Sequence, residues 1–189
     1  MTIHTFFSAD PPPDGQGQII RHFHNSWRKR GWEVTMMNPR TYASHPKRLE
    51  YIARIDALLK ESVLTCGPSD KHRLLRYLAL DSLGSQAVWL AEYDVINFDF
   101  EAHDRYDPRY RGGSVLCGQG IMQIGEGIAR SIVESILDGV NPSFSISALH
   151  GSQDYLAYNW EKSPLVHFSR MACGDESKSA VIESCGRFY

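Results

Sequence analysis

Two acidic residues follow an apolar stretch near the middle of the chain. Glu92 and Asp94 come directly after residues 87–91, which read AVWLA. A continuous apolar run of this length is typical of a strand that is buried on both faces, and ligands of open α/β sheets bind beyond the carboxyl ends of the strands. Two carboxylates at such an end suit Mg²⁺ or Mn²⁺, which would bridge phosphate oxygens. The alternative is two solvated acids in a turn, because this spacing is common.

A second group of charges lies on the segment that precedes this strand. Residues 69–84 have leucines at helical spacing, Ser69 as the expected N-cap and a glycine at the end, so they predict a helix. Asp70, Arg73 and Arg76 lie on it. An arginine here can contact a diphosphate, and Asp70 can accept from a ribose or sugar hydroxyl. A solvated helix face with ion pairs three positions apart would explain the same charges.

The rest of the chain alternates between strand-like and helix-like segments. Strands are predicted at 3–8, 32–37, 87–91, 113–118 and 164–169, and helices at about 17–30, 47–60, 69–84, 128–137 and 152–160, with a surface loop at 101–111. The initial order of strand, helix and strand is the signature of a parallel sheet. We therefore expect one α/β domain over residues 1–189, with a mostly parallel central sheet flanked by helices. The tail beyond about residue 174 is expected to pack loosely.

Composition excludes several classes of protein. The chain has 189 residues, of which 42% are hydrophobic, so one domain with its own core is expected. The formal net charge of -2 gives no basic field for nucleic acid. No run approaches the ~20 apolar residues of a membrane span, and no signal peptide is evident. Four scattered cysteines without a C-x-x-C pair favour reduced thiols. We expect a cytoplasmic protein, and its oligomeric state is left open.

The segment from Arg76 to Asn97 resembles the D-x-D region of glycosyltransferases of the GT-A fold. In that family an arginine on a leucine-rich helix is followed by a glycine pair, a strand, the D-x-D motif and a valine. The resemblance covers about residues 69–97 well, and the first strand and helix loosely. Here Glu92 replaces the first aspartate, Ser85 replaces the second glycine, and the connection is a few residues longer. The resemblance implies a Rossmann-like GT-A domain, a nucleotide-diphosphate-sugar donor and Mn²⁺ or Mg²⁺.

The same resemblance implies roles for two residues late in the chain. His167 lies on the last predicted strand, where many GT-A enzymes place a histidine that would bind the metal together with Glu92 and Asp94. Asp154 lies at a predicted helix start, where relatives keep an acid that faces the sugar or activates the acceptor hydroxyl, so it is the expected catalytic residue. The alternatives are a packed core histidine and a helix N-terminal acid favoured by the helix dipole.

The remaining donor-binding residues come from the first strand and from a glycine-rich segment. Thr5, Phe6 and Ser8 would lie where GT-A enzymes hold the base and the ribose, although core packing explains Phe6 equally well. Gly118 would let the backbone approach the donor or acceptor, and turn formation is its alternative explanation.

Taken together, these residues predict transfer of a sugar to a hydroxyl of a glycan, lipid or protein, as in polysaccharide biosynthesis. A non-catalytic protein that binds sugars or nucleotides, or assists assembly on a transferase scaffold, is an alternative supported by Glu92 and by the short chain. A nucleotidyltransferase is a second alternative, but such enzymes usually carry a glycine-rich basic loop after the first strand. Here residues 8–13 are acidic and rich in proline. The sequence specifies neither the nucleotide, the sugar nor the stereochemistry of transfer.

Overall fold

The computed structural model describes residues 1–9, 14–60, 68–84, 88–102, 121–139, 165–167, 180 and 182–183. The helices are α1 (Asp14–Lys29), α2 (Arg48–Lys60), α3 (Pro68–Ser82) and α4 (Ile128–Leu137). The strands are β1 (Thr2–Phe6), β2 (Glu33–Met37), β3 (Val88–Ala91), β4 (Val95–Asn97), β5 (Ile121–Ile124) and β6 (Leu165–His167). No helix in these ranges has the length and apolar character that crossing a bilayer requires.

The main sheet contains three strands that pair in parallel. Its strand order is β2-β1-β3-β5, and β1 pairs in parallel with both of its neighbours. Strand β5 pairs with β3 in the antiparallel sense, and β4 and β6 form a separate antiparallel pair. Helices and a small parallel sheet confirm the coarse α/β prediction, while β5 adds an antiparallel strand to it.

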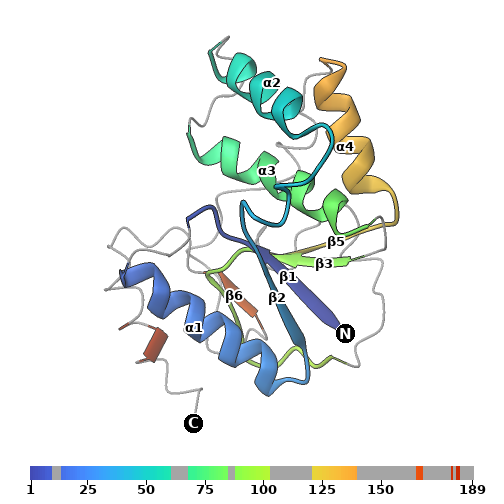
Figure 1. Ribbon diagram of the computed structural model, residues 1–189. Helices are drawn as coiled ribbons and strands as arrows, with labels where there is room; N and C mark the ends of the chain where they lie inside the picture. The colour runs from blue at the N-terminus through green and yellow to red at the C-terminus, as the bar shows by residue number, and fades with distance from the viewer. Residues whose placement is uncertain are drawn as a thin grey trace, which may run out of the picture.

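Helices cover both faces of the sheet (Figure 1). Helix α1 packs on one face, where Ile3 of β1 joins a buried cluster with Phe23 and Trp27. Helices α2, α3 and α4 pack on the other face, where Phe6 contacts a second cluster. Because successive residues of a strand point to opposite faces, β1 contributes to both clusters. At ~25 cal/mol per Å² of apolar surface buried, these two clusters supply the main stabilisation of the fold.

Most predicted element types are confirmed, but two helix starts were placed wrongly. Helix α1 begins at Asp14, upstream of the predicted start near residue 17, although it contains two glycines. The apolar stripe that α1 buries outweighs the cost of about 1 kcal/mol for each glycine. Helix α3 begins at Pro68, so Ser69 lies inside the first turn and is not the N-cap. Proline suits this position because its φ is preset and its missing N–H would have no intrahelical partner.

The ends of two helices follow the sequence prediction. Gly84, which follows α3, has a φ of 97°, and Gly139, which follows α4, has a φ of 78°. Such left-handed backbone is disfavoured for residues with a Cβ and is common just after a helix. Glycine at these two positions therefore ended both helices where the sequence predicted.

Two short strands, β4 and β5, were not predicted. Each has only three or four residues, which is too short for periodicity to separate a strand from other apolar runs. The predicted strand at 113–118 and helix at 152–160 lie outside the described residues, as does nearly all of the predicted loop at 101–111. Two residues near the C-terminus contact the region of α1. Ile182 is fully buried in the cluster that α1 covers, and Glu183 Oε1 lies 3.4 Å from His22 Nε2.

Candidate functional site at the carboxyl end of the sheet

Glu92 and Asp94 lie in the tight turn that joins β3 to β4. The Val95 N–H donates to the Glu92 carbonyl at 3.1 Å and closes this turn. The residue Asp94 is only 3% exposed, and the Glu92 side chain is 22% exposed. The acidic pair therefore lies at a strand end, as predicted, but neither carboxylate is fully solvated. Burial of acidic side chains requires compensating contacts.

Helix α1 holds the chain just beyond the acidic turn. The Trp27 indole N–H donates to the Val95 carbonyl at 2.9 Å, and the Asn97 N–H donates to the Ser26 hydroxyl at 3.1 Å. The Asn97 side chain also exchanges two hydrogen bonds of 2.8 Å with the Phe100 backbone. The sequence predicted the helix that carries Trp27, but the polar role of this side chain was missed. The chemistry of the side chain could have indicated this role, since a buried indole N–H usually finds a hydrogen-bond acceptor.

The end of β1 lies beside the same turn. Strands β1 and β3 are parallel, so their carboxyl ends share one edge of the sheet. There the Phe7 ring meets the Tyr93 ring edge to face, with centroids 5.1 Å apart. Thr5 is fully buried, and its hydroxyl has no hydrogen-bond partner among the described residues. Ser8 is half-buried just beyond the strand. The pairing of β1 with β3 and the contact of Phe7 with Tyr93 therefore bring the segment that holds Thr5 and Ser8 beside the acidic turn.

Phe6, the third predicted residue of this strand, packs elsewhere. Its ring stacks on Tyr42 with centroids 6.3 Å apart, and it contacts the cluster under α2, α3 and α4. This contact agrees with the core-packing explanation of Phe6.

The side chain of Arg76, on α3, contacts the acidic turn. Its side chain is 5% exposed, and Nη1 lies 3.7 Å from Glu92 Oε1. The guanidinium carbon also lies 5.2 Å from the centre of the Tyr77 ring. The Nε and Nη2 groups are buried and have no hydrogen-bond partner among the described residues. A buried cation whose two donors have no partner among the described residues is costly by itself, so these N–H groups are candidates for binding an anionic or polar group.

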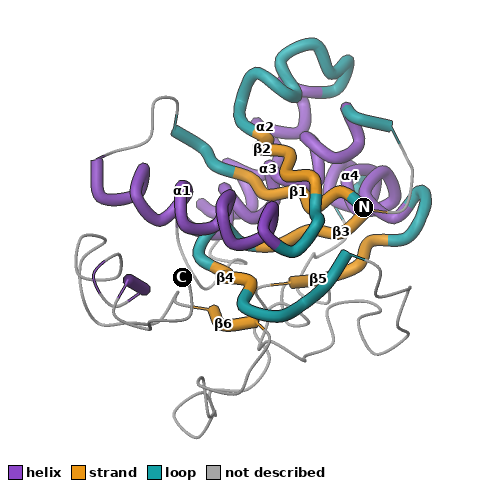
Figure 2. Tube along the Cα trace, turned by 90° about the horizontal axis from the view of Figure 1, so that it is seen from below, coloured by secondary structure: helices purple, strands orange, loops and turns teal. Residues whose placement is uncertain are grey.

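The backbone of His167 lies close to the acidic turn. Strands β4 and β6 pair in the antiparallel sense, with Val95 opposite His167, and Figure 2 shows the two strands side by side. Val95 directly follows Asp94 in the sequence. The fold therefore brings the histidine backbone from a distant part of the chain to the residue that follows the acidic pair.

The side chains of several predicted site residues lie outside the described part of the structure. Asp70 and Arg73 lie on the first half of α3, but their side chains are outside the described part of the structure, as is the His167 side chain. Asp154 and Gly118 are also outside it. Within the described residues, no three acidic, histidine or cysteine side chains gather as a metal site would require.

Comparison with known proteins does not assign this chain. No protein family, no curated protein and no solved structure matches it. Its chemistry therefore has to be argued from the site itself.

The Arg76 and Glu92 pair should respond asymmetrically to substitution. Glu92→Gln is expected to lower the free energy of unfolding by about 1–3 kcal/mol, because it removes a countercharge from a nearly buried guanidinium. Arg76→Met should cost less than about 1 kcal/mol, because it removes two buried N–H groups that have no partner in the described part of the chain and leaves a partly exposed carboxylate that water can reach. Chemical denaturation of both variants measures the difference.

Lys71→Met is the matched control on the same helix, since Lys71 pairs with Asp56 at 2.6 Å and both side chains are partly exposed. An ion pair that water can reach contributes about 0–1 kcal/mol. A loss from Arg76→Met that exceeds the loss from Glu92→Gln would show that Arg76 is a structural anchor.

Proposed function

We propose that the chain is a metal-dependent glycosyltransferase with a GT-A-like domain. It would move a sugar from a nucleotide-diphosphate-sugar to a hydroxyl of a glycan, lipid or protein. One observation carries this proposal: a buried arginine, with two donors that have no partner among the described residues, lies against an acidic turn where the parallel strands of the sheet end. Ligands of α/β sheets bind at such edges, and guanidinium groups suit phosphate oxygens.

The charges around the turn fit a diphosphate that arrives with a cation. Arg76 would donate from Nε and Nη2 to a phosphate oxygen, while Glu92, already beside Arg76, would accept from a ribose or sugar hydroxyl. Asp94 would bind Mn²⁺ or Mg²⁺, with His167 and Glu92 assisting, because carboxylate oxygen and imidazole are suitable ligands for these ions. A bound cation would offset the negative charge that builds on the departing nucleoside diphosphate.

Other residues would complete the donor and acceptor sites. The Thr5 hydroxyl is buried without a partner among the described residues, so it has a donor available for the ribose or base. Ser8 would lie farther out on the same side of the donor. Asp154 would take the proton of the acceptor hydroxyl. Three further residues retain their proposed donor-binding roles from the sequence: Asp70, Arg73 and Gly118.

Two other functions are compatible with this architecture. A nucleotidyltransferase shares the sheet and the metal, but it attaches a nucleotide to a sugar phosphate and releases pyrophosphate. A non-catalytic protein on the same scaffold would bind a nucleotide-sugar and release nothing. The identity of the released product therefore separates all three functions.

The decisive experiment incubates the full chain with a panel of nucleotide-sugars and Mn²⁺, with and without sugar acceptors. Release of nucleoside diphosphate that EDTA abolishes is the expected result, since water can serve as a slow acceptor. Parallel reactions with nucleoside triphosphates and sugar phosphates test for pyrophosphate. If calorimetry finds the same affinity for every nucleotide-sugar in EDTA as in Mn²⁺, the metal assignment is wrong.

A further inference from the structure

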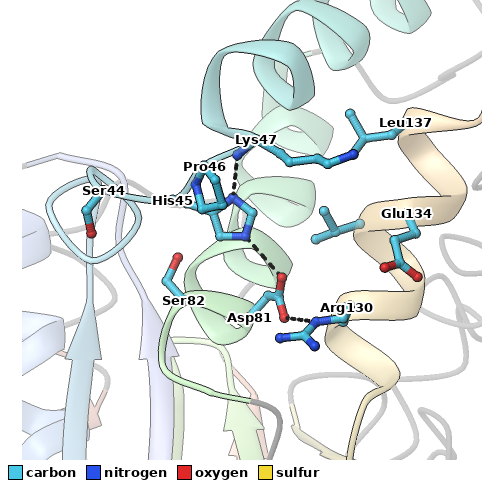
Figure 3. A pocket seen from close by; sticks show the side chains of 10 residues that line it. Ser44, His45, Pro46, Lys47, Asp81, Ser82, Arg130, Glu134 and Leu137 are labelled. Carbon is cyan, nitrogen blue, oxygen red and sulfur yellow. Dashed lines mark hydrogen bonds and ion pairs between the residues drawn. The ribbon is translucent and has the colours of Figure 1, made fainter.

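A hollow lies away from the acidic turn, between the loop that follows β2, the end of α3 and one face of α4 (Figure 3). Its volume is about 380 Å³. Small-molecule sites usually occupy about 300–1,000 Å³. Asp81 lines this hollow, whereas Arg76, five residues earlier on α3, faces the acidic turn. Because 3.6 residues make one helical turn, these two side chains leave α3 on different sides.

Asp81 organises the wall of the hollow. Its side chain is 7% exposed, His45 Nε2 lies 3.0 Å from Oδ2, and Arg130 Nε donates to Oδ1 at 3.1 Å. The Lys47 backbone N–H donates to His45 Nδ1 at 3.2 Å. Since Nδ1 accepts this bond, the ring proton lies on Nε2 and is donated to Asp81. Three segments of the chain are thereby fixed around one carboxylate, which makes the wall preorganised.

The charges in the hollow cancel. Arg130 and Lys47 supply two cations, and Asp81 and Glu134 supply two anions. With Nδ1 as an acceptor, His45 adds no charge in this hydrogen-bonded arrangement. A phosphate or carboxylate ligand would meet two carboxylates, and a cationic ligand would meet two basic side chains. A neutral ligand would make neither of these unfavourable contacts between like charges.

Donors, acceptors and apolar surface all line the hollow. Among the described residues, Arg130 is bonded to Asp81 through Nε, which leaves its outer N–H groups available, and its side chain is 57% exposed. Glu134 adds acceptors and Ser44 adds a hydroxyl, while Leu137 and Val133 add an apolar strip on α4. A compound with many hydroxyl groups offers donors and acceptors around apolar C–H faces, so it matches this lining group by group.

We propose that this hollow binds a neutral polyhydroxylated ligand of saccharide size. The inference does not depend on the proposed transferase activity. It concerns binding without nucleotide or metal, and its residues do not include the acidic turn.

Ligand-observed NMR on the full chain tests the proposal, with methyl glycosides of glucose, galactose, mannose and N-acetylglucosamine as neutral probes and inorganic phosphate as the anionic probe. We expect at least one neutral glycoside to bind in EDTA. Arg130→Met and Glu134→Gln should each raise its dissociation constant about tenfold, which corresponds to about 1.4 kcal/mol. Glu134 is exposed, so Glu134→Gln should keep the wild-type melting temperature, whereas Arg130→Met also removes a partner of the nearly buried Asp81 carboxylate and should lower it.

Glu126→Gln is the matched control, because Glu126 is an exposed acid just before α4 that does not line the hollow. It should bind the glycoside like the wild type, and so should Asp94→Asn. Failure of every neutral glycoside to bind would overturn the proposal, as would binding that neither Arg130→Met nor Glu134→Gln weakens. A further contrary result is that inorganic phosphate binds more tightly than every glycoside and loses its binding in Arg130→Met. That result would identify an anion site and would also overturn the proposal. None of these outcomes changes the nucleoside diphosphate assay, so the two proposals fail separately.

Discussion

Asp94→Asn is expected to lower Mn²⁺-dependent release of nucleoside diphosphate by roughly 10²-fold or more. The proposed role of Asp94 is direct metal contact, and charge stabilisation of this kind typically contributes that much to a rate. The residue is 3% exposed at the strand end, so water cannot readily take over its role. Asparagine keeps nearly the same shape but loses the negative charge that holds a divalent cation.

Glu92→Gln is the comparison variant for this measurement. Glu92 lies beside Arg76 and is more exposed than Asp94, so it is placed to assist the site while Asp94 holds the metal. Its loss of rate should stay near tenfold. Mn²⁺ affinity and melting curves are measured for both variants. A large drop in the melting temperature of Asp94→Asn with unchanged Mn²⁺ affinity would mean that this carboxylate serves the fold and not the chemistry.

The elements that could be predicted from the sequence are those with a strong local pattern. Helices α3 and α4 carry apolar stripes over several turns, and glycines with positive φ end both of them. Strand β3 is a continuous apolar run, which located the acidic turn at its carboxyl end. Strands β4 and β5 were missed because three or four residues contain no usable period.

Contacts between distant segments could not be predicted in the same way. The bond from Trp27 to Val95 spans 68 residues, and the Phe7 and Tyr93 rings meet across two strands. The first depends on which strand α1 packs against and the second on which strands become neighbours, and neither arrangement could be predicted from the sequence. The same limit applies to the hollow around Asp81, whose partners come from a loop and from a different helix. Its histidine, taken alone in the sequence, carried no signal of a site.

The pairing of β4 with β6 leads to the last prediction, that His167→Ala weakens Mn²⁺ binding about 10- to 100-fold. Val95 lies opposite His167, so the histidine backbone is next to the acidic turn. A metal ligand must be neutral imidazole, whose unperturbed pKa is ~6.5. Protons should therefore compete with Mn²⁺, and the affinity of the wild type should fall as the pH drops through the sixes. His167→Ala should flatten this pH dependence as well as lower the affinity.

His4→Gln is the matched control, because His4 lies on β1 in the same sheet and its Nδ1 is 3.3 Å from the Trp89 carbonyl oxygen. Burial lowers the pKa of His4 below its usual 6.5. The unfolded chain therefore takes up this proton first, and the folded state loses stability as the pH falls below 6.5. His4→Gln should reduce that loss of stability and leave Mn²⁺ affinity unchanged. Affinities and apo melting curves over the same pH range thus separate a metal ligand from general acid destabilisation.

If His167 is instead a packed core residue, its removal has the opposite signature. The variant would leave a cavity and an unpaired hydrogen-bond partner, which would destabilise the apo protein by about 1–3 kcal/mol. Its Mn²⁺ affinity would match that of the wild type at every pH. That result would remove His167 from the metal site and leave Asp94 and Glu92 as its proposed protein ligands. Two carboxylates can still hold Mg²⁺ or Mn²⁺ against a diphosphate, so the transferase proposal would then depend on Asp94→Asn alone.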